Sequence, residues 1–174
     1  MSDHPSLMES CACLLPALLE QQAFVFCDLA TAAAAQEVAA DEPAIVAEVE
    51  FAGAATRGHC RLGAPLSLCR EIAANVLGTD PGDAAADQSA SDCLKEVANV
   101  VTGHVLTTHF GEDSQFVIAA PTVRTALPAE WHAALAEPGT EVYLAASQPV
   151  WLLIGFVANA SARGGAAGRS HDHG

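Results

Sequence analysis

The chain is short of positive charge, of aromatic side chains and of long hydrophobic runs. Its 174 residues include seven Lys and Arg against 21 Asp and Glu, and nine of these acids precede the first basic residue, Arg57. A surface this acidic repels the phosphates of nucleic acids and of anionic lipids, so we expect neither as a partner. No apolar run approaches the ~20 residues of a membrane helix. The longest, PVWLLIGFVA from Pro149, is long enough only for a strand.

Several enzyme motifs are missing as well. The sequence has no P-loop, no GxSxG and no HExxH, and its six cysteines form no CxxC pair. We expect these cysteines to be reduced core residues and we expect no metal site, since Cys11 and Cys13 would diverge on a helix. The N-terminus lacks the basic and apolar regions of a secretory signal, which favours a cytoplasmic protein.

The hydrophobic pattern predicts one α+β domain, with helices packed on a mainly antiparallel β-sheet, over residues 1–158. A tail at 159–174, rich in Gly, Ala, Ser and Arg, is expected to be disordered. Apolar residues at helical intervals predict three helices, over residues 6–28, 64–77 and 90–109. Alternating residues predict a hairpin, with strands over 44–51 and 59–63 around a Gly-containing turn. Three further strands are predicted, over 115–120, 141–147 and 149–158.

The remaining stretches are expected to be connections. Residues 29–42 are rich in alanine and acids, and residues 79–90 form an acidic loop. At the end of this loop, the spacing of Ser89 and Asp92 resembles a capping box that would begin the helix at about residue 90. Gly78 follows the preceding helix and is typical of a helix C-terminus.

The third helix carries an unusual polar face. At about 100° per residue, Asp92, Glu96, Asn99 and Gly103 fall within about 60° of one another. We call these four residues the polar stripe. The opposite side is apolar and should be buried, with Leu94, Val97, Ala98, Val101, Val105 and Thr108. A glycine inside a helix costs about 1 kcal/mol relative to alanine, and asparagine is also a weak helix former.

Two interpretations of the polar stripe remain open on geometry alone. It is either an ordinary solvated face or a docking surface that Gly103 keeps low. An ungapped alignment of residues 68–78 with 93–103 places Glu71 on Glu96 but Ala74 on Asn99. Only the second segment therefore carries the Glu and Asn pair.

The pattern Asp92-x-x-x-Glu96-x-x-Asn99, continued as VVTG, resembles the signature helix of the CheC/CheX/FliY class of chemotaxis phosphatases. The order of the predicted elements over residues 6–158 is similar to that class, and Pro121 matches a downstream proline of its pattern. A single Glu-x-x-Asn site favours a CheX-like over a CheC-like protein.

The resemblance implies a phosphatase that hydrolyses the aspartyl-phosphate of a CheY-like response-regulator receiver domain. It implies that Asn99 positions the attacking water, that Glu96 pairs with the receiver's lysine, and that Asp92 and Gly103 face the partner. No cofactor is expected in this chain, because the receiver would hold the Mg²⁺ ion. Two alternatives stay open: a non-catalytic receiver-binding adaptor and a flagellar-switch-like assembly module. Exposed edge strands would also allow a homodimer.

Overall fold

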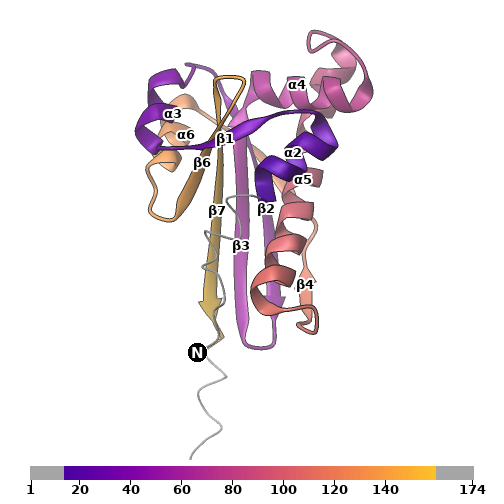
Figure 1. Ribbon diagram of the computed structural model, residues 1–174, viewed down its shortest axis with the longest axis vertical. Helices are drawn as coiled ribbons and strands as arrows, with labels where there is room; N and C mark the ends of the chain where they lie inside the picture. Colours follow the sequence, from indigo (N-terminus) through magenta and orange to yellow (C-terminus); the bar gives the residue numbers. More distant parts are fainter. Residues whose placement is uncertain (1–13, 160–174) are drawn as a thin grey trace, which may run out of the picture.

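The computed structural model describes residues 14–159, and these fold into helices packed on both faces of one β-sheet (Figure 1). In chain order the elements are α2 (Leu14–Ala23), β1 (Cys27–Ala30), α3 (Ala32–Val38), β2 (Ala44–Gly53), β3 (Thr56–Pro65), α4 (Leu66–Leu77), α5 (Ala84–Phe110), β4 (Phe116–Ile118), β5 (Thr122–Ala126), α6 (Pro128–Leu135), β6 (Thr140–Ala145) and β7 (Gln148–Ala158).

The sheet has seven strands, and all of its pairings are antiparallel. Their order is β1-β6-β7-β3-β2-β4, and β5 pairs with the same edge of β2 as β4 does. The predicted fold class, helices on a mainly antiparallel sheet, is confirmed. Within the described range, no helix is long and apolar enough to cross a membrane.

The sheet, with the hairpin of β2 and β3 near its centre, separates two hydrophobic clusters. Residues 45, 47, 49 and 51 of β2 alternate with residues 48 and 50, as the sequence predicted. Residues 45, 47 and 49 are buried beneath α2, α4 and α5, which lie on one face in Figure 1. Phe51 is buried as well, against Phe116 and Phe156. This main cluster includes Leu15, Leu19, Leu62, Leu68, Ile72, Leu94, Val101 and Leu152.

A smaller cluster lies on the other face of the sheet, beneath α3 and α6. Trp131 of α6 stacks on Trp151 of β7, with ring centroids 5.4 Å apart and planes 7° from parallel. Both rings are buried, and Trp131 Nε1 donates to the backbone oxygen of Glu42 at 2.9 Å. Gly63 of β3 makes room for this stack, because a methyl group there would lie 2.0 Å from Trp151 Cζ2.

The predicted helix over 6–28 is wrong at its C-terminal end, and residues 6–13 lie outside the described part. Helix α2 ends at Ala23, and Phe24 takes a left-handed conformation with φ 53°. Buried Val25 and Cys27 then alternate with exposed neighbours, which is the pattern of a strand, and β1 pairs with β6.

Other boundaries also differ from the prediction. The expected connection over 29–42 contains α3, whose N-terminus is capped by Thr31: its Oγ1 accepts from the Ala34 N–H at 3.1 Å. Helix α5 begins at Ala84 behind Asp83, so Ser89 and Asp92 lie inside the helix and form no capping box. The run of alanines after Asp83 has the highest helix propensity, which extends α5 into the expected loop. Strand β5 and helix α6 were not predicted.

The end of α4 agrees with the sequence. Gly78 is left-handed, with φ 68° and ψ 37°, and its N–H donates to the Ala74 carbonyl. At the end of the described range, Asn159 donates from Nδ2 to the carbonyls of Gly53 and Ala54. The expected disordered tail lies, apart from Asn159, outside the described residues.

Strand β7 runs further than its neighbour β6. Beyond Leu153, which pairs with Thr140, β7 pairs with β3 but not with β6. The homodimer that edge strands would allow stays a prediction.

Candidate functional site

The polar stripe faces away from the core because α5 packs its opposite side against the sheet and α4. The buried residues of α5 in this region are Leu94, Val97, Ala98, Val101, Thr102, Val105 and Leu106. Asp92 and Glu96 are exposed, and Asn99 and Gly103 are partly exposed. Thr108, which the sequence placed on the buried side, is exposed as well. The buried side of this part of α5 is instead shifted around the helix, because Thr102 and Leu106, which the sequence did not place there, are buried.

Glu96 and Asn99 lie one helical turn apart, and both are free to bind a partner. Within residues 14–159, neither side chain has a hydrogen bond or an ion pair. The carboxylate of Glu96 can only accept hydrogen bonds, whereas the amide of Asn99 can both accept and donate. Together they provide one negative charge and one uncharged hydrogen-bonding group on the same surface.

Asp92 already has a partner within the chain. Its Oδ1 lies 2.5 Å from Nζ of Lys95, the only lysine in the sequence. The Asp92 side chain is 75% exposed, so the pair lies in solvent and contributes little to stability. Its effect on the polar stripe is to neutralise Asp92, which leaves Glu96 as the stripe's carboxylate without a partner among residues 14–159. A direct role for Asp92 in partner binding stays a prediction.

Gly103 is not required by packing within the described chain. Apart from the backbone of α5 itself and the adjacent residues, a methyl group at this position would meet no atom of the described residues within 4 Å. Its carbonyl accepts from Thr107 Oγ1 at 3.0 Å, one turn further along the helix. The glycine therefore leaves open space beside the polar stripe, at the cost in helix propensity noted above.

The aligned segment of α4 offers no second site. Ala74, which aligns with Asn99, is fully buried, and Glu71 is only partly exposed. An ion pair from Arg70 Nη2 to Asp87 Oδ1, at 2.6 Å, joins α4 to the N-terminal part of α5. The two helices are thus packed together, and the Glu-x-x-Asn spacing occurs in the sequence only on α5.

A groove beside Glu96 was not foreseen from the sequence. It has a volume of about 400 Å³ and lies between the end of α2, α4 and α5. We call it the α4–α5 groove; it is lined by Gln22, Ala23, Ile72, Val76, Leu77, Ser89, Asp92, Cys93, Glu96 and Val97. Its walls come from three separate elements, so no local sequence pattern marks it.

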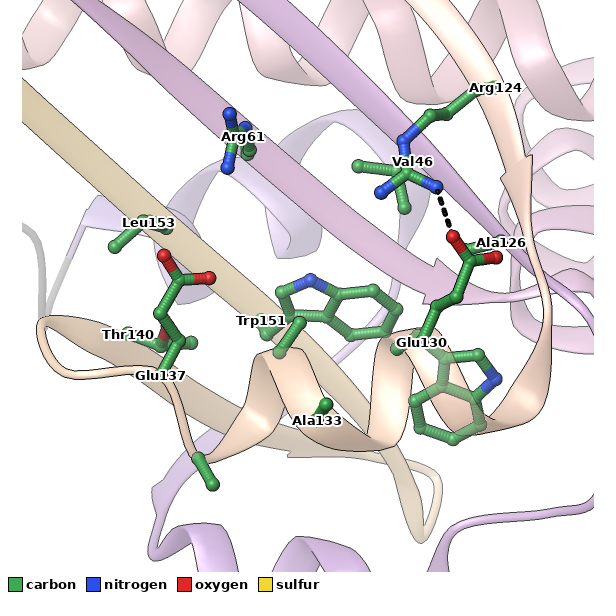
Figure 2. Close-up of a pocket in the computed structure, with 13 residues that line it drawn as sticks. Val46, Arg61, Arg124, Ala126, Glu130, Ala133, Glu137, Thr140, Trp151 and Leu153 are labelled. Atoms are coloured by element: carbon green, nitrogen blue, oxygen red, sulfur yellow. Dashed lines mark ion pairs between the residues drawn. The ribbon is translucent and has the colours of Figure 1, made fainter.

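A second hollow lies on the opposite face of the sheet (Figure 2). It has a volume of about 470 Å³ between α6 and the strands, with Trp151 at its centre in the view. Both of its arginines are paired: Arg61 Nε lies 2.8 Å from Glu48 Oε2, and Arg124 Nη1 lies 3.5 Å from Glu130 Oε1. Glu137 lines the hollow as well. The hollow is separated from the polar stripe by the sheet.

The thiols and histidines offer no competing catalytic centre in the described part of the chain. Burial raises the pKa of Cys60 to about 11 and that of Cys69 to about 12, so both thiols stay protonated near neutral pH. His104 is exposed, and His109 stacks on Phe156 with ring centroids 5.7 Å apart. Between residues 14 and 159, no group of three or more His, Cys, Asp or Glu side chains could hold a metal ion.

Solved structures of chemotaxis proteins share this fold. CheX from Vibrio vulnificus is 17% identical, with a TM-score of 0.66, over 90% of this chain and 100% of that one. CheX in a CheX-CheY-BeF3-Mg complex from Borrelia burgdorferi is 13% identical, with a TM-score of 0.54, over 90% and 99%. FliY from Thermotoga maritima is 11% identical, with a TM-score of 0.54, over 85% of each chain. No curated protein sequence matches the chain.

A family model matches the sequence itself. The model describes chemotaxis phosphatase CheX, and it matches residues 45–143. This range runs from β2 to β6 and contains the whole of α5 with its polar stripe. The chain therefore belongs to the CheX family of chemotaxis phosphatases.

Proposed function

We propose that the protein is a phosphatase that hydrolyses the aspartyl-phosphate of a CheY-like receiver domain. The observation that carries this proposal is the pair of Glu96 and Asn99, reachable from solvent and without partners in the described chain. Membership of the CheX family supports the reaction. The Borrelia burgdorferi relative in complex with CheY, BeF3 and Mg²⁺ supports the kind of partner.

The roles of the two side chains follow from their chemistry. The carbonyl of Asn99 accepts a hydrogen bond from a water molecule and holds it in line with the phosphorus atom. Attack by this water breaks the bond between phosphorus and the aspartyl oxygen, which releases inorganic phosphate and the free carboxylate. Because an amide does not titrate, this positioning is the same across the physiological pH range. The carboxylate of Glu96 accepts a charge-assisted hydrogen bond from the receiver's lysine and anchors α5 over the site.

The protein needs to supply little beyond the positioning of a water molecule and of the receiver's lysine. The receiver provides the acyl phosphate, the Mg²⁺ ion and the lysine, and no cofactor is proposed for this chain. A hundredfold acceleration requires about 2.7 kcal/mol of transition-state stabilisation. One oriented water and one ion pair are sufficient for this amount, so neither a nucleophile nor a metal ion is needed here.

The test is the decay of a phosphorylated receiver in the presence of Asn99→Ala. We expect the acceleration to disappear, while the free energy of unfolding stays within about 0.5 kcal/mol, as for an ordinary surface position. We expect Glu96→Ala to weaken receiver binding, and Glu71→Ala, at the aligned position of α4, serves as the matched control. Unchanged decay with Asn99→Ala would refute the proposal.

The same measurements identify the alternatives. Receiver binding that Glu96→Ala weakens, without any faster loss of phosphate, would make the protein an adaptor. Oligomers that persist when the polar stripe is substituted, seen by light scattering, would indicate an assembly module instead.

A further inference from the structure

The α4–α5 groove exposes apolar side chains to solvent. Val76 and Leu77 line it from the last turn of α4, and their side chains are 50% and 46% exposed. Ile72, Cys93 and Val97 complete the wall. Its volume of about 400 Å³ falls within the ~300–1,000 Å³ of ordinary ligand pockets. Exposed apolar side chains that gather around a hollow are typical of an interaction site.

The position of the groove relative to Glu96 identifies its occupant. On the helical wheel of α5, Cys93 and Val97 lie about 60° and 100° to one side of Glu96, whereas Asn99 lies about 60° to the other. Glu96 therefore stands between the groove and Asn99. A receiver that places its phosphoryl group over Asn99 and its lysine on Glu96 must extend its neighbouring surface over the groove.

The charges around the groove fit the same partner. Asp92 and Glu96 are the charged residues of its lining, and both are acidic. Asp92 is neutralised by Lys95, whereas Glu96 has no partner in the described chain. An apolar occupant next to a cation is thus favoured over an anionic or a purely polar one.

We propose that the α4–α5 groove receives an apolar side chain of the receiver, from the surface next to the lysine that contacts Glu96. This inference rests on the proposed function and adds a determinant of specificity to it. Glu96 and Asn99 meet groups that the chemistry requires of every substrate, so they distinguish poorly between receivers. The groove contacts a position that receivers are free to vary, and it selects those with a large apolar residue there.

The test compares substitutions in the groove wall with a substitution at the catalytic position. Leu77→Gln and Val76→Gln each replace a half-exposed apolar side chain of the groove wall with a polar one that still favours a helix. Because both positions are half-exposed, neither substitution opens a cavity in the core. Leu127→Gln is the matched control, because Leu127 is also exposed, at 63%, but precedes α6 on the other face of the sheet. Thermal unfolding followed by circular dichroism verifies that each variant is folded.

Two quantities are measured with a receiver that the wild-type protein dephosphorylates: the dissociation constant for its BeF3 and Mg²⁺ form, and steady-state phosphate release. We expect both groove variants to raise the dissociation constant and KM at least tenfold, with kcat unchanged. We expect Asn99→Ala to give the reverse, a loss of kcat with binding retained, and Leu127→Gln to match the wild type.

Protection of Cys93 provides an independent readout of contact. In a background with Cys11→Ala and Cys13→Ala, we expect receiver at a concentration that half-saturates the wild type to slow alkylation of Cys93, which lines the groove. At the same concentration we expect much less protection in the Leu77→Gln variant. Unchanged affinity in both groove variants would overturn the inference and leave the phosphatase assignment intact. If the wild type neither binds nor dephosphorylates any receiver assayed, both the inference and the proposed function are overturned. If the groove variants form smaller oligomers than the wild type when measured by light scattering without receiver, the groove binds a second copy of the chain and the inference is overturned.

Discussion

Replacing Gly103 with alanine should stabilise the protein and weaken its action on the receiver. Gly103 lies inside α5 and is partly exposed. Outside the backbone of the helix and the adjacent residues, no atom in the described part of the chain lies within 4 Å of an added methyl group. The substitution therefore meets no steric cost and gains the difference in helix propensity, about 1 kcal/mol. For a domain of this size, that gain raises the thermal midpoint by about 2–4 °C.

The expected effect on the receiver has the opposite sign. The added methyl group projects from the polar stripe one turn beyond Asn99, into the surface that we propose the receiver covers. Crowding a packed surface by one methyl group costs about 1–3 kcal/mol, which corresponds to roughly a five- to 150-fold weaker complex. We expect this loss in the affinity for the BeF3 and Mg²⁺ form of the receiver.

Gly111→Ala is the matched control. A methyl group at Gly111 also meets no atom within 4 Å, but the residue closes α5 with φ 87° and ψ 160°. This backbone conformation is essentially restricted to glycine, so the substitution should destabilise the protein by about 1–3 kcal/mol. Urea unfolding followed by circular dichroism measures both variants. A lower free energy of unfolding for Gly103→Ala would refute the packing argument; greater stability with unchanged affinity would refute the docking of the receiver at this position.

Three further predictions concern stability. Burial raises the pKa of Glu141 above its ordinary value of 4.5, and the hydrogen bond from Tyr143 opposes this only in part. The folded state therefore binds the proton more tightly than the unfolded state, and the protein loses stability as pH rises above 4.5. Glu141→Gln should thus be more stable than the wild type at neutral pH, with a difference that vanishes in acid; a constant difference would contradict this. Thr140 Oγ1 is buried without a hydrogen-bond partner in the described part of the chain. Thr140→Val should therefore add about 1 kcal/mol to the free energy of unfolding measured by urea titration. A lower free energy of unfolding would show that Oγ1 has a partner. Asn159→Ala should cost about 1 kcal/mol by removing hydrogen bonds to the β2–β3 turn, and an unchanged thermal midpoint would exclude that anchoring role.

Long periodic segments were predictable from the sequence, and short ones were not. Helix α5 spans 27 residues, so its apolar period was visible even though its start was misplaced. Helix α6 has eight residues and buries only Trp131 and Leu135 of them, which is too few to establish a period. Strand β5 buries only Ala126 of five. These elements form because the sheet and its second core layer offer them a place to pack, which is tertiary information.

The same distinction applies to the candidate site. The polar stripe was predictable because its four residues lie on one helix, where spacing alone determines which side chains are neighbours. The α4–α5 groove was not predictable, because Ala23, Val76 and Val97 come from three separate elements. The pairing of Asp92 with Lys95 was also missed, although the two lie three residues apart on the helix surface.

The tryptophan stack between α6 and β7 has a practical consequence for spectroscopy. The chain has two tryptophans, and both are in this stack, on the opposite face of the sheet from α5. Intrinsic fluorescence excited at the indole band will therefore report on whether α6 stays docked, and will be nearly silent when a ligand covers Glu96 and Asn99. A fluorescent reporter of complex formation has to be introduced near α4 or carried by the receiver.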